Sequence, residues 1–426
     1  NQLFFFKTLP SWIIILMPAL LISGPFLSDL GLSLVAILFL INSAKNDLKK
    51  YYNNIFFKIF ILFCLVLILS SLFSNNIIIS LKNSFFYFRF GIFSLCFWYL
   101  LDNNEKLIKY IFISILLCFS LLIVDGYFQY IFGKNIFGYE LYNNYRISSF
   151  FGSELILGSY LARFFPILFG IFIFLDQKKR NKLMLFSITI VFILSEGLIF
   201  LSGERLALFF MNLSAIYIIL MLKEYKLYRL WTYLVSLTLI IFLLNVYPNA
   251  KERFINQTFD DFTGATKTDN ENREKLYIFS KPHTDMYITA YNIFLDNKLF
   301  GVGPRQYRNE CQNYIVSAYS CETHPHNTYI ELLSEAGIFS FLIVFGYSLN
   351  PRLAKKNERI IFFKIYIIFS NDSLNFHKVS LNFISNPNCP LKFSIFPGLH
   401  GGPHSMLPPL PKSILNYRKI SFSKFS

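Results

Sequence analysis

The chain has 426 residues, of which 54% are hydrophobic, 19% aromatic and only 15% charged. A soluble domain carries about 25% charged residues, so this chain lacks the polar surface that a soluble protein of its size needs. The same composition excludes intrinsic disorder, and six cysteines are too few for a disulfide scaffold. The net charge of +15 is explained by basic cytoplasmic loops, without a nucleic-acid partner. We therefore expect an all-α polytopic membrane protein whose surroundings are the lipid bilayer.

Long apolar runs divide most of the chain into segments that could cross a bilayer. A spanning helix needs about 20 predominantly apolar residues, whereas a transmembrane barrel would show short alternating strands. The sequence predicts about ten transmembrane helices, and Pro10, Pro18 and Pro25 interrupt the first two runs. The candidate spans are 3–22, 24–41, 55–73, 84–101, 107–124, 155–175, 183–201, 206–222, 228–247 and 328–349.

The basic residues of the loops indicate how these helices are oriented. With a cytoplasmic N-terminus, the cytoplasmic loops hold 16 Lys and Arg residues and the short outer loops hold four. Lys and Arg collect on the cytoplasmic side of membrane proteins. The asymmetry therefore predicts that the N-terminus is cytoplasmic.

This orientation divides the chain into four parts. Residues 1–247 hold helices one to nine, residues 248–327 form one large periplasmic loop domain, and residues 328–349 form helix ten. The loop carries 9 basic and 10 acidic residues, and its length and mixed charge predict a small folded cap, with an amphipathic helix over 284–297. Residues 350–426 are rich in proline and hold no run long enough to span, so we expect a cytoplasmic or poorly ordered tail, possibly an aberrant one.

Two of the six cysteines lie in the expected outer cap. Cys311 and Cys321 are ten residues apart on a side that is oxidising in a bacterium. We expect them to form a disulfide, the alternative being two free thiols. Three other cysteines lie in apolar runs and are expected to be packing residues.

Ionisable side chains within the apolar runs fall in the outer half of the expected membrane layer. Arg89, Arg163 and Glu335 lie deepest. Such residues are unfavourable in lipid and usually serve a function, whereas those nearer the helix ends are explained by snorkelling at the interface. The pattern predicts a polar cavity that opens to the outside.

A short polar motif, HPHNTYIE, occupies residues 324–331 immediately before helix ten. Thr328 and Glu331 match the capping box that opens a helix. His324 and His326 are thereby expected at a helix N-terminus, whose positive field attracts phosphate and favours a neutral imidazole. A neutral imidazole can accept a proton, so His326 is a candidate base. The alternative is that both histidines are ordinary residues of an interfacial loop.

Neighbouring residues give no recognisable metal or nucleotide motif. The outer cysteines, Glu322 and the two histidines do not have a zinc spacing, so no metal and no cofactor are expected. Gly301 to Pro304 resembles half of a phosphate-binding loop. It does not follow a strand, and Pro304 lacks an N–H, so a tight turn is favoured.

Three stretches resemble motifs of the O-antigen ligase and polymerase family, also called the lipid A-core:surface polymer ligases. LSGER at 201–205 is similar to a Ser-Gly-x-Arg signature that opens a span on the outer face. NKLFGVGPRQY at 297–307 is similar to a P-x-x-G-x-G segment that follows a loop helix. HPHNTYIELLSEAG at 324–337 closely resembles the most specific motif of the family. The order and spacing of the motifs match over roughly residues 50–349.

The resemblance implies a metal-independent membrane glycosyltransferase of lipopolysaccharide biosynthesis. It would lie in the bacterial inner membrane as a multi-pass protein with its active site on the periplasmic face. The donor would be a glycan on undecaprenyl pyrophosphate, and the acceptor of an O-antigen ligase would be lipid A-core. A polymerase would instead join the glycan to a second lipid-linked repeat.

The candidate residues divide into two roles. His326, with His324 beside it, is the candidate catalytic group because an acceptor hydroxyl needs a base or a positioning group. Guanidinium groups suit phosphate oxygens, and polar residues of the second and third motifs lie near them in sequence. The candidates for binding substrate or pyrophosphate are Arg205, Arg89, Arg305, Asn327 and Glu335.

Two other classes of membrane protein compete with the glycosyltransferase. An outward-facing secondary transporter would also need a polar cavity, but the sequence shows neither an inverted repeat nor paired broken helices. A purely structural anchor would have no use for Arg and Glu within its spans. Glycan transfer without substrate uptake would separate the enzyme from the transporter.

Overall fold

The computed structural model describes residues 2–176, 182–222, 224–263 and 280–349. Helices dominate this part of the chain, and the β pairing found in it consists of two isolated bridges in the loop after α7. The all-α fold is therefore confirmed.

The first helices are α1 (Gln2–Ile22), α2 (Pro25–Lys45), α3 (Lys49–Tyr52), α4 (Ile55–Leu72), α5 (Ile77–Phe85), α6 (Phe88–Asn103) and α7 (Leu107–Phe132). They are followed by a 3-10 turn η1 (Ser149–Phe151), α8 (Leu157–Asp176), α9 (Lys182–Ser202), α10 (Arg205–Met221) and α11 (Lys226–Val246).

The last helices belong to the outer segment and to the final span. They are α12 (Pro248–Lys251), a π-helical turn η2 (Glu252–Asn256), α13 (Gln257–Thr263), α14 (Lys281–Asp296), α15 (Tyr307–Glu310), a 3-10 turn η3 (Cys311–Tyr314) and α16 (Thr328–Leu349). The tail expected over residues 350–426 lies outside the described residues.

Each of the ten expected spans coincides with a helix. Eight helical stretches of the described chain are long and apolar enough to cross a membrane, and α5 and α6 together make up one of them. The other two expected spans correspond to shorter apolar helices, Phe6–Ile22 and Arg205–Met221. In lipid a backbone must satisfy its own hydrogen bonds, which is why long apolar runs become helices. The chain is thus a polytopic membrane protein.

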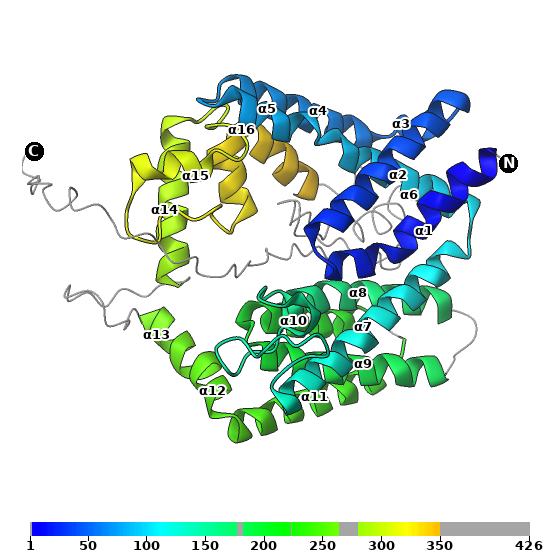
Figure 1. Ribbon diagram of the computed structural model, residues 1–426, viewed down its shortest axis with the longest axis vertical. Helices are drawn as coiled ribbons and strands as arrows, with labels where there is room; N and C mark the ends of the chain where they lie inside the picture. The colour runs from blue at the N-terminus through cyan, green and yellow to red at the C-terminus, as the bar shows by residue number, and fades with distance from the viewer. Residues whose placement is uncertain (1, 177–181, 223, 264–279, 350–426) are drawn as a thin grey trace, which may run out of the picture.

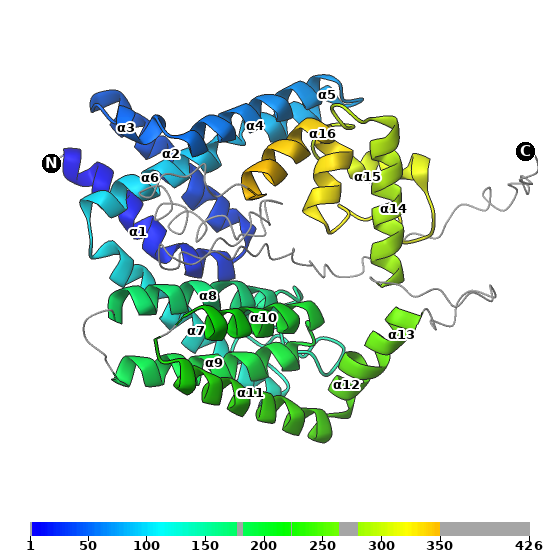
Figure 2. The same ribbon diagram turned by 180° about the vertical axis from the view of Figure 1, so that it is seen from behind.

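The helices form two groups that face each other (Figures 1 and 2). Helices α1 to α6 lie in one group, where α16 packs on α4 and α14. Helices α7 to α11 make up the other group, in which α8 packs on α7, α9 and α10. Helix α7 also packs on α1, which joins the two groups.

Local sequence explains several of the helix ends. Gly24 adopts a φ of 116°, and Pro25 then opens α2, so the chain reverses tightly between α1 and α2. Gly133 ends α7 in the left-handed conformation that glycine accepts without strain. Asn54 caps α4 by accepting a hydrogen bond from the Phe57 N–H at 2.8 Å.

Helix α7 is longer than expected, and its last turns hold the loop that follows it. Asp125, one residue beyond the expected span 107–124, is completely buried, and it accepts hydrogen bonds from Ser149 Oγ at 2.6 Å and the Ile136 N–H at 3.0 Å. Gln129 Oε1 accepts from the Ser148 and Ser149 N–H groups at 3.1 and 2.7 Å. These bonds fix the loop that carries Arg146.

The expected amphipathic helix of the outer segment is α14. Met286, Ala290 and Ile293 are buried on one face of it, as the pattern predicted. Ala290 and Ile293 form a small core with Val302, Tyr307 and Cys311. This part of the outer segment therefore has a hydrophobic core of its own beside α16.

Candidate functional site

Three arginines converge on the turn between α9 and α10, which holds the Ser-Gly-Glu-Arg motif. Arg146 Nε donates to the Ser202 carbonyl at 2.7 Å, and Arg253 Nε donates to the Gly203 carbonyl at 2.5 Å. Arg205 opens α10, and one of its terminal nitrogens donates to Thr258 Oγ1 at 3.0 Å. We call Arg146, Arg205 and Arg253 the arginine cluster.

The arginines lie close enough to oppose one another electrostatically. Burial lowers the pKa of Arg146 to about 10, and the neighbouring charge of Arg253 acts in the same direction. Burial also lowers the pKa of Arg253, with a further contribution from Arg205. A side chain at position 203 would collide with this arrangement, because a Cβ there would lie 2.9 Å from Arg146 Nε and 3.0 Å from Arg253 Nε. The glycine of the motif thus lets two guanidinium groups approach the turn.

Glu204, the acidic residue of the same motif, contributes to the architecture. Its carboxylate accepts hydrogen bonds from the Gly158 N–H at 2.6 Å, the Ser159 N–H at 2.9 Å and Ser159 Oγ at 2.7 Å. These groups lie at the N-terminus of α8, where unpaired N–H groups favour a negative charge. Burial raises the pKa of Glu204, and the hydrogen bonds from Ser159 and Gly158 oppose that shift. The motif therefore joins the start of α8 to the start of α10.

A second cluster, of three histidines, lies in the outer segment next to α16. The ring centroids of His324 and His326 are 4.3 Å apart, and those of His283 and His326 are 5.8 Å apart. His283 Nδ1 lies 2.7 Å from Ser280 Oγ, and His324 Nδ1 lies 2.8 Å from Thr323 Oγ1. All three imidazoles are half-buried. We call His283, His324 and His326 the histidine cluster.

The start of α16 differs in detail from the capping box that the sequence predicts. Asn327 is the capping residue: its side-chain oxygen accepts from the Tyr329 N–H at 3.1 Å, and its carbonyl accepts from the Glu331 N–H at 2.8 Å. Thr328 is the first helical residue. Asparagine and threonine are both favourable N-cap residues. The predicted position of the N-cap was wrong by one residue. His326 still directly precedes the helix.

Glu335 and the Gly-Val-Gly-Pro segment are packed against each other. Glu335 is 8% exposed, and its two oxygens accept from the Arg305 N–H at 2.8 Å and the Tyr307 N–H at 2.9 Å. Its carbonyl accepts from the Gly303 N–H at 2.8 Å. The carboxylate expected among the substrate-binding groups thus holds the backbone of the second motif. The side chain of Arg305 is exposed.

The tight turn expected at Gly301 to Pro304 fits into a break of α16. Gly337 interrupts that helix with a φ of 72°, and Ile338 N–H donates to the Lys298 carbonyl at 2.9 Å. A Cβ at Gly301 would collide with the backbone at Glu335. The second and third motifs are therefore neighbours in space, because the turn of the second motif packs into the break that Gly337 makes in the third.

Arg89 lies on α6, apart from the arginine cluster. Its terminal nitrogens donate to Asp29 Oδ1 at 2.6 Å and Ser33 Oγ at 3.0 Å on α2. The charge of Arg89 is thus paired with the carboxylate of Asp29 on α2, in the helix group on which α16 packs.

The structure therefore places the expected site residues, apart from Arg89, in two sets. His324, His326, Asn327, Arg305 and Glu335 lie together around the start of α16, and Arg205 lies at the start of α10 in the other helix group. The outer cap also contains a disulfide between Cys311 and Cys321, whose Cα atoms are 5.4 Å apart. Among the described residues, no group of three or more His, Cys, Asp or Glu side chains is arranged to hold a metal ion.

Three residues of these clusters were not singled out from the sequence. Arg146 was counted only as a charge of an outer loop, Arg253 lies in a nearly neutral segment, and His283 lies on an amphipathic helix. Each reaches its cluster through tertiary packing from an element distant in sequence. The sequence signal for a structured loop before Arg146 is the pair Asn143-Asn144, because asparagine adopts positive φ angles more readily than most residues.

The helices and the two polar clusters define a polytopic membrane protein with cationic and imidazole groups at the ends of its spans. Residues 188–345 match the family model described as O-antigen ligase. The resemblance to that family is confirmed over this segment, which includes Arg205, Arg253 and the histidine cluster. The match indicates a function of the O-antigen ligase or polymerase type, and hence a membrane glycosyltransferase-like enzyme acting on lipid-linked glycans. A search of curated proteins found no match to the chain.

Proposed function

We propose that the protein transfers a glycan from undecaprenyl pyrophosphate to lipid A-core at the periplasmic face of the inner membrane. The observation that carries this proposal is the convergence of Arg146, Arg205 and Arg253 on one turn at the end of two spans. Mutual repulsion among cations is relieved when a polyanion binds between them. A pyrophosphate anchored in the outer leaflet by its lipid tail is such a polyanion.

The arginine cluster would bind the pyrophosphate and stabilise its charge during transfer. Arg146 and Arg253 each direct Nε to a backbone carbonyl, and a guanidinium has further N–H groups that can bind phosphate oxygens in pairs. As the bond between the sugar C1 and the phosphate oxygen breaks, its electron pair passes to the pyrophosphate. Prepositioned cations stabilise that developing charge without further reorganisation.

The histidine cluster would activate the acceptor hydroxyl. In the proposed step the acceptor hydroxyl attacks C1, its oxygen forms the new glycosidic bond, and its proton passes to His326. His326 directly precedes α16, whose N-terminal field disfavours a protonated imidazole before the step. His324 and His283 adjoin that ring, so the proton is delivered into a group of imidazoles. No metal or nucleotide sugar enters this scheme.

The remaining candidates would position the reacting groups. Asn327 caps α16 and so fixes the backbone that follows His326. Glu335 holds the backbone N–H groups of Arg305 and Tyr307. That bond orients the exposed Arg305 side chain, which we propose as an additional contact for the donor.

The direct test is transfer of labelled glycan in purified membranes. Donor lipid is supplied with lipid A-core in one reaction and with a second lipid-linked repeat in another. Product on lipid A-core supports the ligase, and lengthened lipid-linked glycan without it supports the polymerase. Uptake of glycan into vesicles without any transfer would contradict both and favour a transporter.

A matched control separates chemistry from folding. Lys134→Ala removes an exposed cation from the loop that also carries Arg146, and the Lys134 ammonium lies 3.0 Å from the carboxylate of the exposed Glu140. This variant should transfer glycan at the normal rate. Loss of transfer in both Lys134→Ala and Arg205→Lys would point to a general disturbance of the outer face and contradict the specific assignment.

A further inference from the structure

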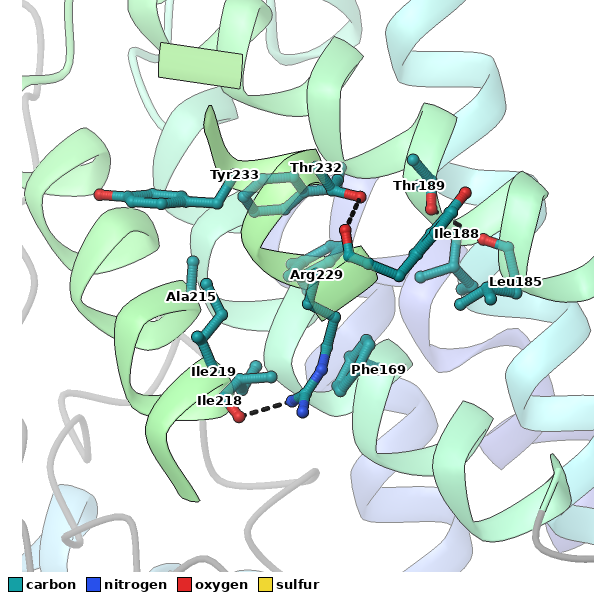
Figure 3. A pocket seen from close by; sticks show the side chains of 13 residues that line it. Phe169, Leu185, Ile188, Thr189, Ala215, Ile218, Ile219, Arg229, Thr232 and Tyr233 are labelled. Atoms are coloured by element: carbon teal, nitrogen blue, oxygen red, sulfur yellow. Dashed lines mark hydrogen bonds between the residues drawn. The ribbon is translucent and has the colours of Figure 1, made fainter. Parts of the chain in front are cut away.

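A cavity lies among α8, α9, α10 and α11, toward the ends of these helices opposite the arginine cluster (Figure 3). Its empty space amounts to about 420 Å³, including the open mouth. Phe165 and Phe169 of α8, Ile188 of α9 and Ala215 of α10 are among its lining residues. All four are buried apolar side chains.

Two of the neutral polar groups that line the cavity, the threonine hydroxyls, are satisfied within their own helices. Thr189 Oγ1 donates to the Leu185 carbonyl at 2.9 Å, and Thr232 Oγ1 donates to the Tyr228 carbonyl at 3.0 Å. A polar ligand would lose its hydrogen bonds to water and find few replacements here. Hydrocarbon is therefore the chemistry that fits the cavity.

One charged side chain breaks this apolar lining. Arg229 of α11 is 7% exposed, and its terminal nitrogens donate to the Ile218 carbonyl at 2.5 Å and the Leu222 carbonyl at 2.7 Å, at the end of α10 (Figure 3). A guanidinium has five N–H donors, so these two bonds leave others available. Its buried Nε has no hydrogen-bond partner among the described residues. Arg229 thus places a positive charge at the edge of the apolar lining, although Nε itself is covered by neighbouring atoms.

The charges around Arg229 are mixed. Lys226 opens α11 and Lys182 opens α9 at the same ends of the helices. Glu224 interacts electrostatically with Arg229, and Asp176 accepts a hydrogen bond from the Tyr225 hydroxyl at 2.7 Å. Arg229 and the two lysines lie on the side that the loop charges assign to the cytoplasm, where anionic lipid headgroups attract basic residues.

We propose that this cavity binds an anionic phospholipid of the cytoplasmic leaflet. A segment of one acyl chain would occupy the space lined by Phe169 and Ala215, and the phosphate would lie at the mouth near Arg229. The apolar cavity suits the acyl chain of a lipid, and the cation at its edge suits the phosphate. The site lies away from both polar clusters and does not depend on the proposed glycan transfer.

Lipid binding to the purified full chain tests the proposal by native mass spectrometry. Phosphatidylglycerol should bind about fivefold more tightly than phosphatidylcholine, since one basic residue near a headgroup contributes about 1 kcal/mol. Ala215→Phe fills the cavity and should abolish the tight binding. Leu213→Phe, on an exposed position of the same helix, is the control and should leave it unchanged.

A second variant tests the headgroup separately. Arg229→Gln keeps a donor for the α10 carbonyls but removes the charge, so phosphatidylglycerol should fall to the affinity of phosphatidylcholine. If this variant does not fold, Ala215→Phe decides the outcome. Equal binding of the two lipids to the wild type, or tight binding retained in Ala215→Phe, would overturn the proposal.

Discussion

His326 and Arg305 hold backbone conformations that most side chains avoid. Their φ angles are 51° and 63°, in the left-handed region. Such conformations are unfavourable by about 1–3 kcal/mol each and gather at functional sites. Both residues lie at the edges of the segments that meet around α16, which supports a functional constraint on them. Substitutions at position 326 should therefore preserve the backbone.

The first prediction concerns His326 and uses asparagine in place of alanine. Asparagine tolerates a left-handed backbone, so His326→Asn removes the base with little backbone strain. If His326 accepts the hydroxyl proton, glycan transfer should fall by about 10²–10⁴-fold, the usual contribution of a general base. Initial transfer rates at saturating donor measure the effect, and donor binding should be largely unchanged.

A pH–rate profile distinguishes this role from simple positioning. The wild-type rate should fall at acid pH as the imidazole becomes protonated, and this acid limb should be missing in His326→Asn. His324→Asn, a matched change in the neighbouring ring, should have a smaller effect. An unchanged acid limb in His326→Asn would leave His326 as a residue of the helix start.

The second prediction concerns the arginine cluster. Arg205→Lys and Arg146→Lys keep the charge but lose the paired N–H groups that suit phosphate. A hydrogen bond to a charged group contributes about 1.5–3 kcal/mol, so each variant should weaken donor binding by about tenfold or more. Titration with undecaprenyl pyrophosphate measures this directly.

Arg89→Lys provides the comparison within the same class of residue. The charge of Arg89 is paired with Asp29, so its replacement should weaken donor binding less than that of Arg205. A larger effect at Arg89 than at Arg205 and Arg146 would move the pyrophosphate site to the other helix group.

At the scale of elements, α16 is formed by two helical pieces joined at Gly337. The expected span over 328–349 has the same ends as the helix, but a single glycine within a helical pattern does not reveal a break. The break exists because residues 298–303 make backbone hydrogen bonds at Ser334, Glu335 and Ile338. A pairing between segments 30 residues apart cannot be read from local pattern, although both motifs were visible.

The third prediction tests that break. In Gly337→Ala the new Cβ would collide with the Leu299 carbonyl, and φ is positive, so the protein should lose about 1–3 kcal/mol of stability. Gly346→Ala is the control, since nothing lies within 4 Å of its Cβ position. Thermal unfolding in detergent compares the two. Equal melting temperatures would mean that the break is not required.

The fourth prediction concerns the disulfide of the outer cap. Cys311 is buried in the small core beside Tyr307, and its bond to Cys321 connects η3 to the stretch that leads to α16. Without reduction, neither thiol should be alkylated in the native protein. Cys64, Cys96 and Cys118 are buried free thiols and should label only after denaturation. Mass mapping that finds both outer thiols alkylated in native protein would contradict the disulfide.

At the scale of the whole molecule, the two polar clusters lie on different helix groups. The histidine cluster belongs to the group of α4, α14 and α16, and the arginine cluster to the group of α8, α9 and α10. The proposed donor would bind the helix group that holds the arginine cluster, and the proposed acceptor would bind the group that holds the histidine cluster. Glycan transfer would therefore need both helix groups. The hydrophobic pattern predicted the apolar helices, of which eight stretches are long enough to span and two are shorter. It could not predict which helices pack together, because most spans are apolar on all sides.

The last prediction tests the orientation on which both clusters depend, because the same face must hold the arginines and the histidines. Single cysteines replace exposed residues at the two ends of the helices: Lys134 and Asn309 on the expected outer side, and Glu105 and Glu224 on the expected cytoplasmic side. Among the described residues the native cysteines are buried or disulfide-bonded. Cys389 lies outside the described residues and is replaced by serine in every variant, so that the background stays unlabelled. In intact spheroplasts, an impermeant maleimide should label positions 134 and 309 and reach positions 105 and 224 only after permeabilisation. We expect this result because Lys and Arg are concentrated in the loops on the side of positions 105 and 224. Labelling of positions 105 and 224 but not of 134 and 309 in intact spheroplasts would reverse the orientation and place both clusters on the cytoplasmic side, where a periplasmic transfer site could not use them.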